Sequence, residues 1–254
     1  AVELDINPQG SVSQFFDAIT IQELRRNYAC PAYWEGDLVY DRDSGEPSDL
    51  QAREKGKLKL WAMPDHRGRP AVGRYGMGAD IAAGTGATPS CISIINATTG
   101  QKVAEYTDAH ISPEKLAPLA VGLARLFHDG EGNGALFCWE AAGPGLKFGQ
   151  EVLALGYRHL WYKTDEFGTE QKQSDKPGWY PAPNNKLTLL MDYRGALQGR
   201  RVENRSDAAL AECLAFKYDG RGFVEHANEF STEDPTAARV NHADHVIADA
   251  LAWK

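Results

Sequence analysis

Residues 75–106 read YGMGADIAAGTGATPSCISIINATTGQKVAEY, and this stretch decides the fold. Residues 75–81, 91–95 and 102–106 are apolar or alternate between apolar and polar side chains, which predicts three β-strands. Residues 96–100, NATTG, are turn formers between the second and third strand. Because the connections are short, we expect the three strands to form an antiparallel meander.

Downstream of the meander, helical and strand patterns alternate. Ser112 and Pro113 are typical of a helix start, and leucines follow at helical spacing as far as residue 127. Residues 135–140, ALFCWE, predict a buried strand that ends in a carboxylate. The remaining expected elements are a helix over 146–155, a fifth strand over 157–162, and helices over 187–197, 206–216 and 241–253. This order predicts an α/β fold with a mixed five-stranded sheet flanked by helices.

The first 70 residues have a weaker pattern. We expect a short helix over 19–26, a loop-rich stretch after it, and a half-buried strand over 57–62. Residues 64–70 are rich in turn formers. The interpretation is a lead-in segment, 1–70, packed on a main domain, 71–254. Within the main domain, the polar stretch 163–185 is long enough for a functional or mobile loop.

Composition excludes several classes of protein. The 254 residues are 43% hydrophobic and 24% charged, unlike disordered or fibrous chains. No apolar run approaches the roughly 18 residues of a membrane span, and the first residues lack the pattern of a signal peptide. Since residue 1 is Ala and not Met, we expect a processed chain or an excised segment. The net charge of −8 argues against a general nucleic-acid coat but not against a nucleic-acid enzyme.

The four cysteines are far apart in the sequence. Without a C-x-x-C pair, a cysteine zinc site is not expected. Cys91 and Cys138 lie in apolar runs and are predicted to be buried free thiols, which fits a reducing, intracellular location.

Three carboxylates lie where an element begins or ends. Asp80 ends the first strand of the meander, on the same face as Gly76 and Gly78, a face that another group can approach closely. Glu140 ends the 135–140 strand, which should neighbour the Asp80 strand. Asp244 opens the final helix on its inward face, whereas Asp249 is expected on another face.

Each carboxylate also has an ordinary structural explanation. Asp80 could cap the following turn, Glu140 could reach solvent, and Asp244 could complement the helix dipole. Taken together, three acids from distant segments are the ligands that hard divalent cations prefer, and such cations catalyse phosphodiester hydrolysis.

Other motifs are weak. His242 and His245 form H-x-x-H, but no third ligand follows at zincin spacing. The 84–86 GTG loop is not part of a Walker A motif, and no nucleophile elbow occurs. Basic residues cluster at 53–59, 67–74 and 194–205, and these clusters are solvated faces or phosphate contacts. Trp179 and Tyr180 either stack on bases or anchor the long loop.

Five segments, in order, resemble the nuclease domain of tailed-phage terminase large subunits. YGMGADIAAG, 75–84, resembles the family's G-x-D-x-A-x-G strand, and Trp139-Glu140 with Gly143 resembles its central acidic strand. Residues 155–162 resemble the segment after that strand, and Gly178-Trp179 with Lys186 resembles its G-W-x-T…K loop. NHADHVIA, 241–248, resembles its closing G-H-D-D-x-V-x-A. The lead-in, over 3–16 and 31–61, is similar to the passage between the family's motor and its nuclease.

The resemblance implies a ribonuclease H-like fold and a metal-dependent endonuclease that cuts concatemeric double-stranded viral DNA during genome packaging. Asp80, Glu140 and Asp244 would be both the catalytic and the metal-binding residues, holding Mg²⁺ or Mn²⁺, with two ions expected. Further implied partners are a preceding ATPase domain, the portal and the small terminase subunit, in the host cell cytoplasm, with the isolated domain monomeric. The expected DNA contacts are Lys147, Trp179, Lys186, Arg200 and Arg201.

The sequence departs from the family pattern at several positions. Ala243 replaces the first acid of the closing D-D, so a fourth ligand is in question. Ala141-Ala142 follows Glu140, where the family often has Asn, and Pro181 replaces the loop Thr.

Two other functions stay open. An actin-like phosphotransferase also carries an Asp and Gly-Thr-Gly near its first strand, as over 80–86, but would need a second phosphate loop. A non-catalytic module that grips DNA or docks the motor would keep the acids without using them.

Overall fold

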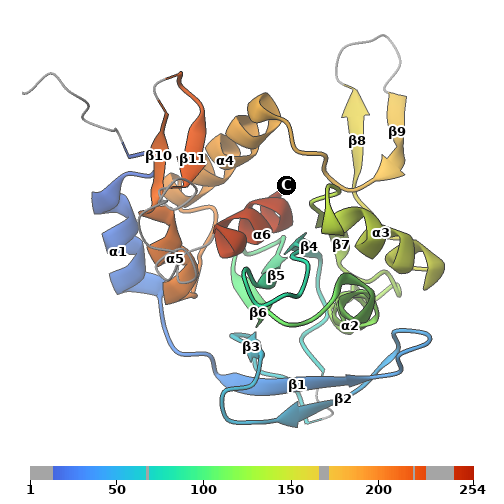
Figure 1. Ribbon diagram of the computed structural model, residues 1–254. Coiled ribbons are helices and arrows are strands. Elements are labelled where there is room, and N and C mark those ends of the chain that lie inside the picture. Colours follow the sequence, from blue (N-terminus) through green and yellow to red (C-terminus); the bar gives the residue numbers. More distant parts are fainter. Residues whose placement is uncertain (1–13, 67–68, 166–171, 220, 227–242) are drawn as a thin grey trace, which may run out of the picture.

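The computed structural model describes residues 14–66, 69–165, 172–219, 221–226 and 243–254 (Figure 1). In chain order the elements are α1 (Ala18–Tyr28), β1 (Trp34–Tyr40), β2 (Pro47–Ala52), β3 (Leu58–Leu60), β4 (Tyr75–Asp80), β5 (Ser90–Asn96), β6 (Lys102–Asp108), α2 (Pro113–Leu126), β7 (Leu136–Trp139), α3 (Pro144–Ala154), β8 (Tyr162–Asp165), β9 (Lys172–Pro177), α4 (Pro183–Gln198), α5 (Asp207–Cys213), β10 (Phe216–Tyr218), β11 (Val224–His226) and α6 (Asp244–Trp253). None of the helices in the described ranges is long and apolar enough to cross a membrane.

A mixed sheet of seven strands organises the molecule, in the order β2-β1-β3-β6-β5-β4-β7. The predicted meander is confirmed, because β4, β5 and β6 pair antiparallel in sequence order. Strand β7 then pairs parallel to β4, with Gly78 opposite Cys138. Since α2 lies between β6 and β7 in the chain, it provides part of the crossover that a parallel neighbour of β4 requires.

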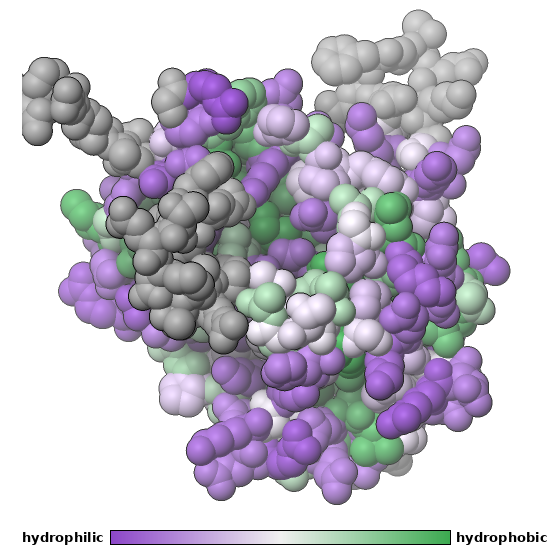
Figure 2. Space-filling view, in the orientation of Figure 1, coloured by the Kyte–Doolittle hydropathy of each residue, from purple (hydrophilic) through white to green (hydrophobic). Residues whose placement is uncertain are grey.

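Helices cover both faces of the sheet, each over its own hydrophobic core. One core joins Met77 and Ala79 of β4 to residues of α2 and α3. The other joins Ile95 and Cys138 to residues of α4, α5 and α6. Figure 1 shows α6 against β4 and β5, with α2 and α3 on the opposite side. The face seen in Figure 2 is largely hydrophilic, with hydrophobic residues in small groups.

Strand β4 contacts α6 through its two glycines. A Cβ on Gly76 would lie 2.2 Å from the Ala252 carbonyl oxygen, and one on Gly78 would lie 2.1 Å from the Ala248 carbonyl oxygen. The prediction of a glycine face open to close approach is therefore confirmed, and the approaching group is the backbone of α6. Asp80 follows on that same face.

The predicted α/β class is confirmed, but the sheet is larger than the expected five strands. Strands β1 and β2 form from the stretch interpreted as loop: β2 lies at the edge of the sheet and β1 next to it, and their mixed polar side chains hide the strand pattern. Between residues 157 and 162, Leu160 makes a single parallel bridge to Phe137 and not a full strand. The predicted helix over 206–216 ends at Cys213, since Phe216 begins the β10–β11 hairpin.

The segment 14–60 is built into the same architecture. Strand β3 pairs antiparallel with β6, and β1 pairs with both β2 and β3. The boundary at residue 70 between a lead-in and a main domain stays a prediction. All four cysteines are unbridged, and Cys91, Cys138 and Cys213 are buried, as expected for Cys91 and Cys138.

Candidate functional site

The three predicted carboxylates come from neighbouring elements. Asp80 is the last residue of β4, and Glu140 directly follows β7. The Glu140 N–H donates to the Ala79 carbonyl oxygen at 3.0 Å, so the two acids lie at the carboxyl-terminal edge of adjacent parallel strands. Asp244 is the first residue of α6, the helix that packs on β4. Ligands in open α/β sheets bind outside this edge of the strands.

All three carboxylates have raised pKa values. Burial raises the pKa of Asp80 well above its ordinary value, and repulsion from Asp244 and Glu140 adds to this effect. Burial raises the pKa of Asp244 to about 7, with further contributions from Glu212 and Glu140. Burial also raises the pKa of Glu140. Asp80 and Asp244 therefore lie in the electrostatic field of neighbouring carboxylates.

The donor set fits a hard divalent cation. All three groups are carboxylates, and Oδ2 of Asp244 is buried without a hydrogen-bond partner among the described residues. Within the described ranges, however, no three His, Cys, Asp or Glu side chains are spaced to hold a metal ion as they stand. The carboxylates are thus close enough for Asp244 and Glu140 to repel Asp80, but the three are not arranged to coordinate one ion together. Their assignment as metal ligands stays a prediction.

Lys186 is the basic residue that the fold brings to these acids. It lies in the first turn of α4, and its positive charge lowers the pKa values of both Asp80 and Glu140. A cation facing two carboxylates is also placed to meet a phosphate beside them. Lys186 is therefore the member of the predicted DNA-contact set that lies at the candidate site.

Trp179 has a structural role. Its N–H donates to the Trp139 carbonyl oxygen at 2.8 Å, and its own carbonyl oxygen accepts from the Ala141 N–H at 2.7 Å. The residue is only 5% exposed, so little of its ring is open for stacking on a base. These contacts fit the alternative in which Trp179 anchors the long loop. The neighbouring Tyr180 is more open, at 41% exposed.

Lys147, Arg200 and Arg201 are not among the charges that shift the pKa values of the three acids. Lys147, on α3, pairs with Glu151 one turn away. Arg200 and Arg201 follow the end of α4, about 20 Å from Lys186 at 1.5 Å per residue. Arg200 pairs with Glu23, and the Arg201 guanidinium lies over the Trp253 ring. His242 of the weak H-x-x-H motif lies outside the described residues.

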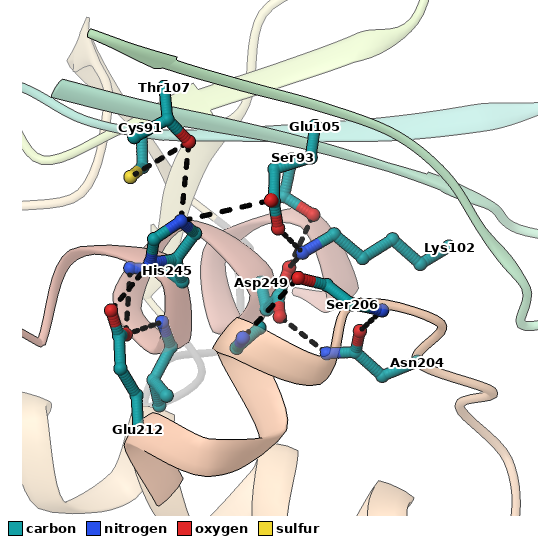
Figure 3. A network of polar contacts seen from close by, with 12 residues as sticks. Cys91, Ser93, Lys102, Glu105, Thr107, Asn204, Ser206, Glu212, His245 and Asp249 are labelled. Atoms are coloured by element: carbon teal, nitrogen blue, oxygen red, sulfur yellow. Dashed lines mark hydrogen bonds and ion pairs between the residues drawn. The ribbon is translucent and has the colours of Figure 1, made fainter. Parts of the chain in front are cut away.

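A buried polar network behind the site was missed from the sequence (Figure 3). Lys102 of β6 is 0% exposed and pairs with Glu105 at 2.6 Å and with Asp249 of α6 at 2.7 Å. The sequence pattern placed Asp249 away from the inward face and gave it no role. The sequence signal that could have revealed this network is Asp249 itself, an ionisable residue within an apolar helix. Burying such a charge is costly unless an opposite charge pairs with it.

Glu212 of α5 also belongs to this network. Its carboxylate accepts hydrogen bonds from the backbone N–H groups of His245 and Val246 and contacts Nδ1 of the His245 ring. It contributes to the raised pKa values of Asp80 and Asp244, so it lies close to the candidate site. No sequence motif pointed to it.

An open groove of about 620 Å³ lies beside Trp179. Trp161, Tyr180, Asn185 and Lys254 contribute to its walls. Lys254 Nζ lies 5.2 Å from the Trp161 ring centroid, so the groove presents aromatic and basic groups.

No protein-family model matches this chain, and no curated protein matches its sequence. The fold is similar to the crystal structure of the large terminase nuclease from the thermophilic phage G20c with bound magnesium. That comparison has a TM-score of 0.51 and 17% identity, and covers 88% of this chain and 98% of the other. The cobalt-bound structure of the same nuclease gives the same values. The large terminase nuclease domain of Thermus phage P74-26 has a TM-score of 0.50 and 16% identity, over 92% of this chain and 93% of the other.

These similarities confirm the predicted resemblance at the level of the fold. The chain has the ribonuclease H-like architecture of phage large terminase nuclease domains.

Proposed function

We propose that this chain is a metal-dependent endonuclease that cuts double-stranded, concatemeric viral DNA during genome packaging. The observation that carries the proposal is that burial raises the pKa values of Asp80, Glu140 and Asp244, which come from three separate elements, and that the charges of Asp244 and Glu140 raise that of Asp80 further. Buried like charges are costly unless a counter-charge joins them. We propose Mg²⁺ or Mn²⁺, in two ions, as that counter-charge; the similarity of the fold to a nuclease crystallised with bound magnesium supports a divalent cation.

The three carboxylates would supply the oxygen ligands. When bound, two hard cations polarise the scissile phosphate and lower the pKa of the attacking water, so that no histidine base is needed. Lys186 places a positive charge beside the same acids, where it would neutralise part of a phosphate's charge. Trp179 forms backbone hydrogen bonds with Trp139 and Ala141, the two residues on either side of Glu140. These bonds fix the backbone at Glu140.

The proposal extends to the setting in which the chain works. We place it with a packaging ATPase, a portal and a small terminase subunit in the host cell cytoplasm, and expect the nuclease domain by itself to be a monomer. The lead-in, 1–70, would connect the nuclease to the motor.

Supercoiled plasmid provides the test. The chain should nick or linearise the plasmid with Mn²⁺ and not with EDTA. Asp80→Asn, Glu140→Gln and Asp244→Asn should each lower the rate at least about 100-fold, because each loses a charged ligand. The matched control is Asp43→Asn, an exposed carboxylate in the turn between β1 and β2, which should cut at the wild-type rate. Undiminished cutting by Asp80→Asn, or cutting in EDTA, would contradict the proposal.

The two alternatives give other outcomes. In the 84–86 loop, a Cβ on Gly84 would lie 2.5 Å from the Ile111 carbonyl oxygen, so this loop packs on the protein and not around an open phosphate site. ATP binding by the chain would nevertheless favour a phosphotransferase. DNA binding in a chain that takes up no divalent cation in titration calorimetry would favour a non-catalytic module.

A further inference from the structure

The first turn of α6 is capped by a residue from another helix. Ala243 occupies the N-cap position and has no side-chain oxygen to accept hydrogen bonds from the helix. Instead, Oε2 of Glu212 accepts from the His245 N–H at 3.0 Å and from the Val246 N–H at 3.2 Å. A carboxylate at this position is also favoured by the helix dipole. Glu212 thus replaces the missing cap across 33 positions of sequence.

Asp244 is the residue that this cap affects. An Asp at the start of a helix ordinarily competes for the unpaired N–H groups of the first turn. In α6 two of these donors already bond Glu212, and Oδ2 of Asp244 is buried without a hydrogen-bond partner in the described part of the chain. A buried carboxylate oxygen in this state is costly in the absence of a bound cation.

Glu212 is itself held on several sides (Figure 3). Its Oε1 contacts Nδ1 of His245, and Nε2 of that ring lies 3.2 Å from the Thr107 hydroxyl of β6. Further along α6, Asp249 pairs with Lys102, so the helix is fixed at its first turn and at its middle. The capping geometry is therefore built into the core between α5, α6 and the sheet.

We propose that Glu212 is a positioning residue: by capping α6 from α5, it keeps the Asp244 carboxylate off its own helix and available to a divalent cation. This inference rests on the proposed function for the identity of the ligand, a hard divalent cation, but its capping step does not require the metal.

The capping step is tested by melting the protein in EDTA. Asp244→Ala in the otherwise wild-type chain should raise the melting temperature by about 2–4 °C, because it removes a buried, unsatisfied carboxylate. In the Glu212→Ala background the Asp244 carboxylate is free to turn back and cap α6. There Asp244→Ala should lower the melting temperature by a similar amount. If Asp244→Ala shifts the melting temperature in the same direction in both backgrounds, the proposal is overturned.

If Glu212→Ala does not fold, the comparison is made with Glu212→Leu, which removes both acceptor oxygens but keeps a side chain of similar size. The stabilisation produced by Asp244→Ala should then shrink by at least half. An unchanged stabilisation would overturn the inference.

The metal step is tested by titration calorimetry with Mn²⁺. Glu212→Ala should weaken Mn²⁺ binding at least about tenfold, and Glu212→Gln should restore it to within about threefold of wild type. The matched control is Asp17→Ala, which removes the carboxylate cap of α1 and should leave Mn²⁺ affinity unchanged. Wild-type affinity in a folded Glu212→Ala variant would overturn the inference. If the wild type binds no Mn²⁺, the proposed function fails, and the melting comparison still decides the capping step.

Discussion

Glu105 is a carboxylate that the fold keeps charged in the core. Its burial opposes ionisation, but the Lys102 ammonium, with His245 nearby, outweighs that effect and lowers the pKa of Glu105 to about 2. The two carboxylates around Lys102, Glu105 and Asp249, raise the pKa of the lysine in turn. A buried pair of this kind is strongly destabilising when one member is removed.

The stability of the fold should therefore fall with acid in a way that depends on Glu105. Its folded pKa lies below its ordinary value of 4.5, so its contribution is complete above about pH 4.5 and is lost as the pH falls toward 2. The contribution at neutral pH is on the order of 3 kcal/mol. Urea unfolding of wild type and Glu105→Gln between pH 7 and pH 2 should show a stability difference that closes below pH 4.5. A difference independent of pH would contradict this assignment.

Lys186 should matter to DNA cleavage more than any other predicted contact. Its charge acts on Asp80 and Glu140, so Lys186→Met removes a cation from the place where a phosphate would meet the acids. We expect kcat/KM on plasmid to fall at least about tenfold and its salt dependence to weaken.

The matched control for Lys186 is Lys147→Met. The Lys147 ammonium is engaged with Glu151 on α3, and we expect less than a twofold effect on cleavage. Equal losses in the two variants would show that the effect is general electrostatic attraction to DNA and would contradict a specific role for Lys186.

At the scale of the elements, α6 lies directly on the backbone of β4. A Cβ on Gly78 would lie 2.1 Å from the Ala248 carbonyl oxygen and 2.3 Å from the Ala252 nitrogen. Backbone atoms in a helix cannot rotate away as a flexible side chain does. The glycine is therefore what allows the helix that carries Asp244 to lie beside the strand that carries Asp80.

Gly78→Ala should consequently destabilise the fold by about 3 kcal/mol or more, because β4 cannot move without breaking its pairing with β5 and β7, and α6 cannot move without disrupting its core. Guanidinium unfolding measures this loss. Gly130→Ala is the control, since its Cβ would lie 3.4 Å from a Val72 methyl group, an ordinary contact, and we expect a change within about 1 kcal/mol. A Gly78→Ala variant as stable as wild type would show that α6 can shift along β4.

At the scale of the whole molecule, residues 14–60 contribute to both cores. Phe15 and Phe16 are buried with residues of α4 and α5, while Leu58 and Leu60 are buried with residues of α2. Strand β3 also covers the edge of β6. The segment predicted as a lead-in therefore supplies core side chains on both faces of the sheet.

A chain that begins at residue 71 should not reach the native fold. It loses the partner strand of β6 and exposes apolar surface in both cores, which favours edge-to-edge association. We expect aggregation, or a monomer without a cooperative melting transition, in size-exclusion chromatography and thermal unfolding. A chain of residues 14–254, tested alongside it, should remain monomeric and melt cooperatively. A stable, active 71–254 fragment would contradict this prediction.

Local patterns alone determined a large part of this protein. The alternation of Gly76 and Gly78 with Met77 and Ala79 placed the glycines and Asp80 on one face, because strand side chains alternate with a period of two residues. Likewise Ser112 and Pro113 marked the start of α2, because residue preferences at a helix N-terminus are local; Ser112 is the N-cap residue and Pro113 begins the helix, although the Ser112 side chain makes no capping hydrogen bond. Polar edge strands such as β2 escaped prediction because both of their faces resemble loop sequence.

Only the tertiary structure decided how the charged groups meet. The Ser93 hydroxyl bonds Asp249 across 156 positions, and Glu212 caps α6 across 33. Spacing along the chain carries no information about such pairs, since they depend on which helix the sheet brings against which strand. For the same reason the sequence could nominate Asp80, Glu140 and Asp244, but the repulsion that Asp80 feels from the other two exists only once β4, β7 and α6 are packed together. The cap from Glu212, which accompanies an Asp244 Oδ2 without a hydrogen bond to any described residue, likewise requires the packed helices.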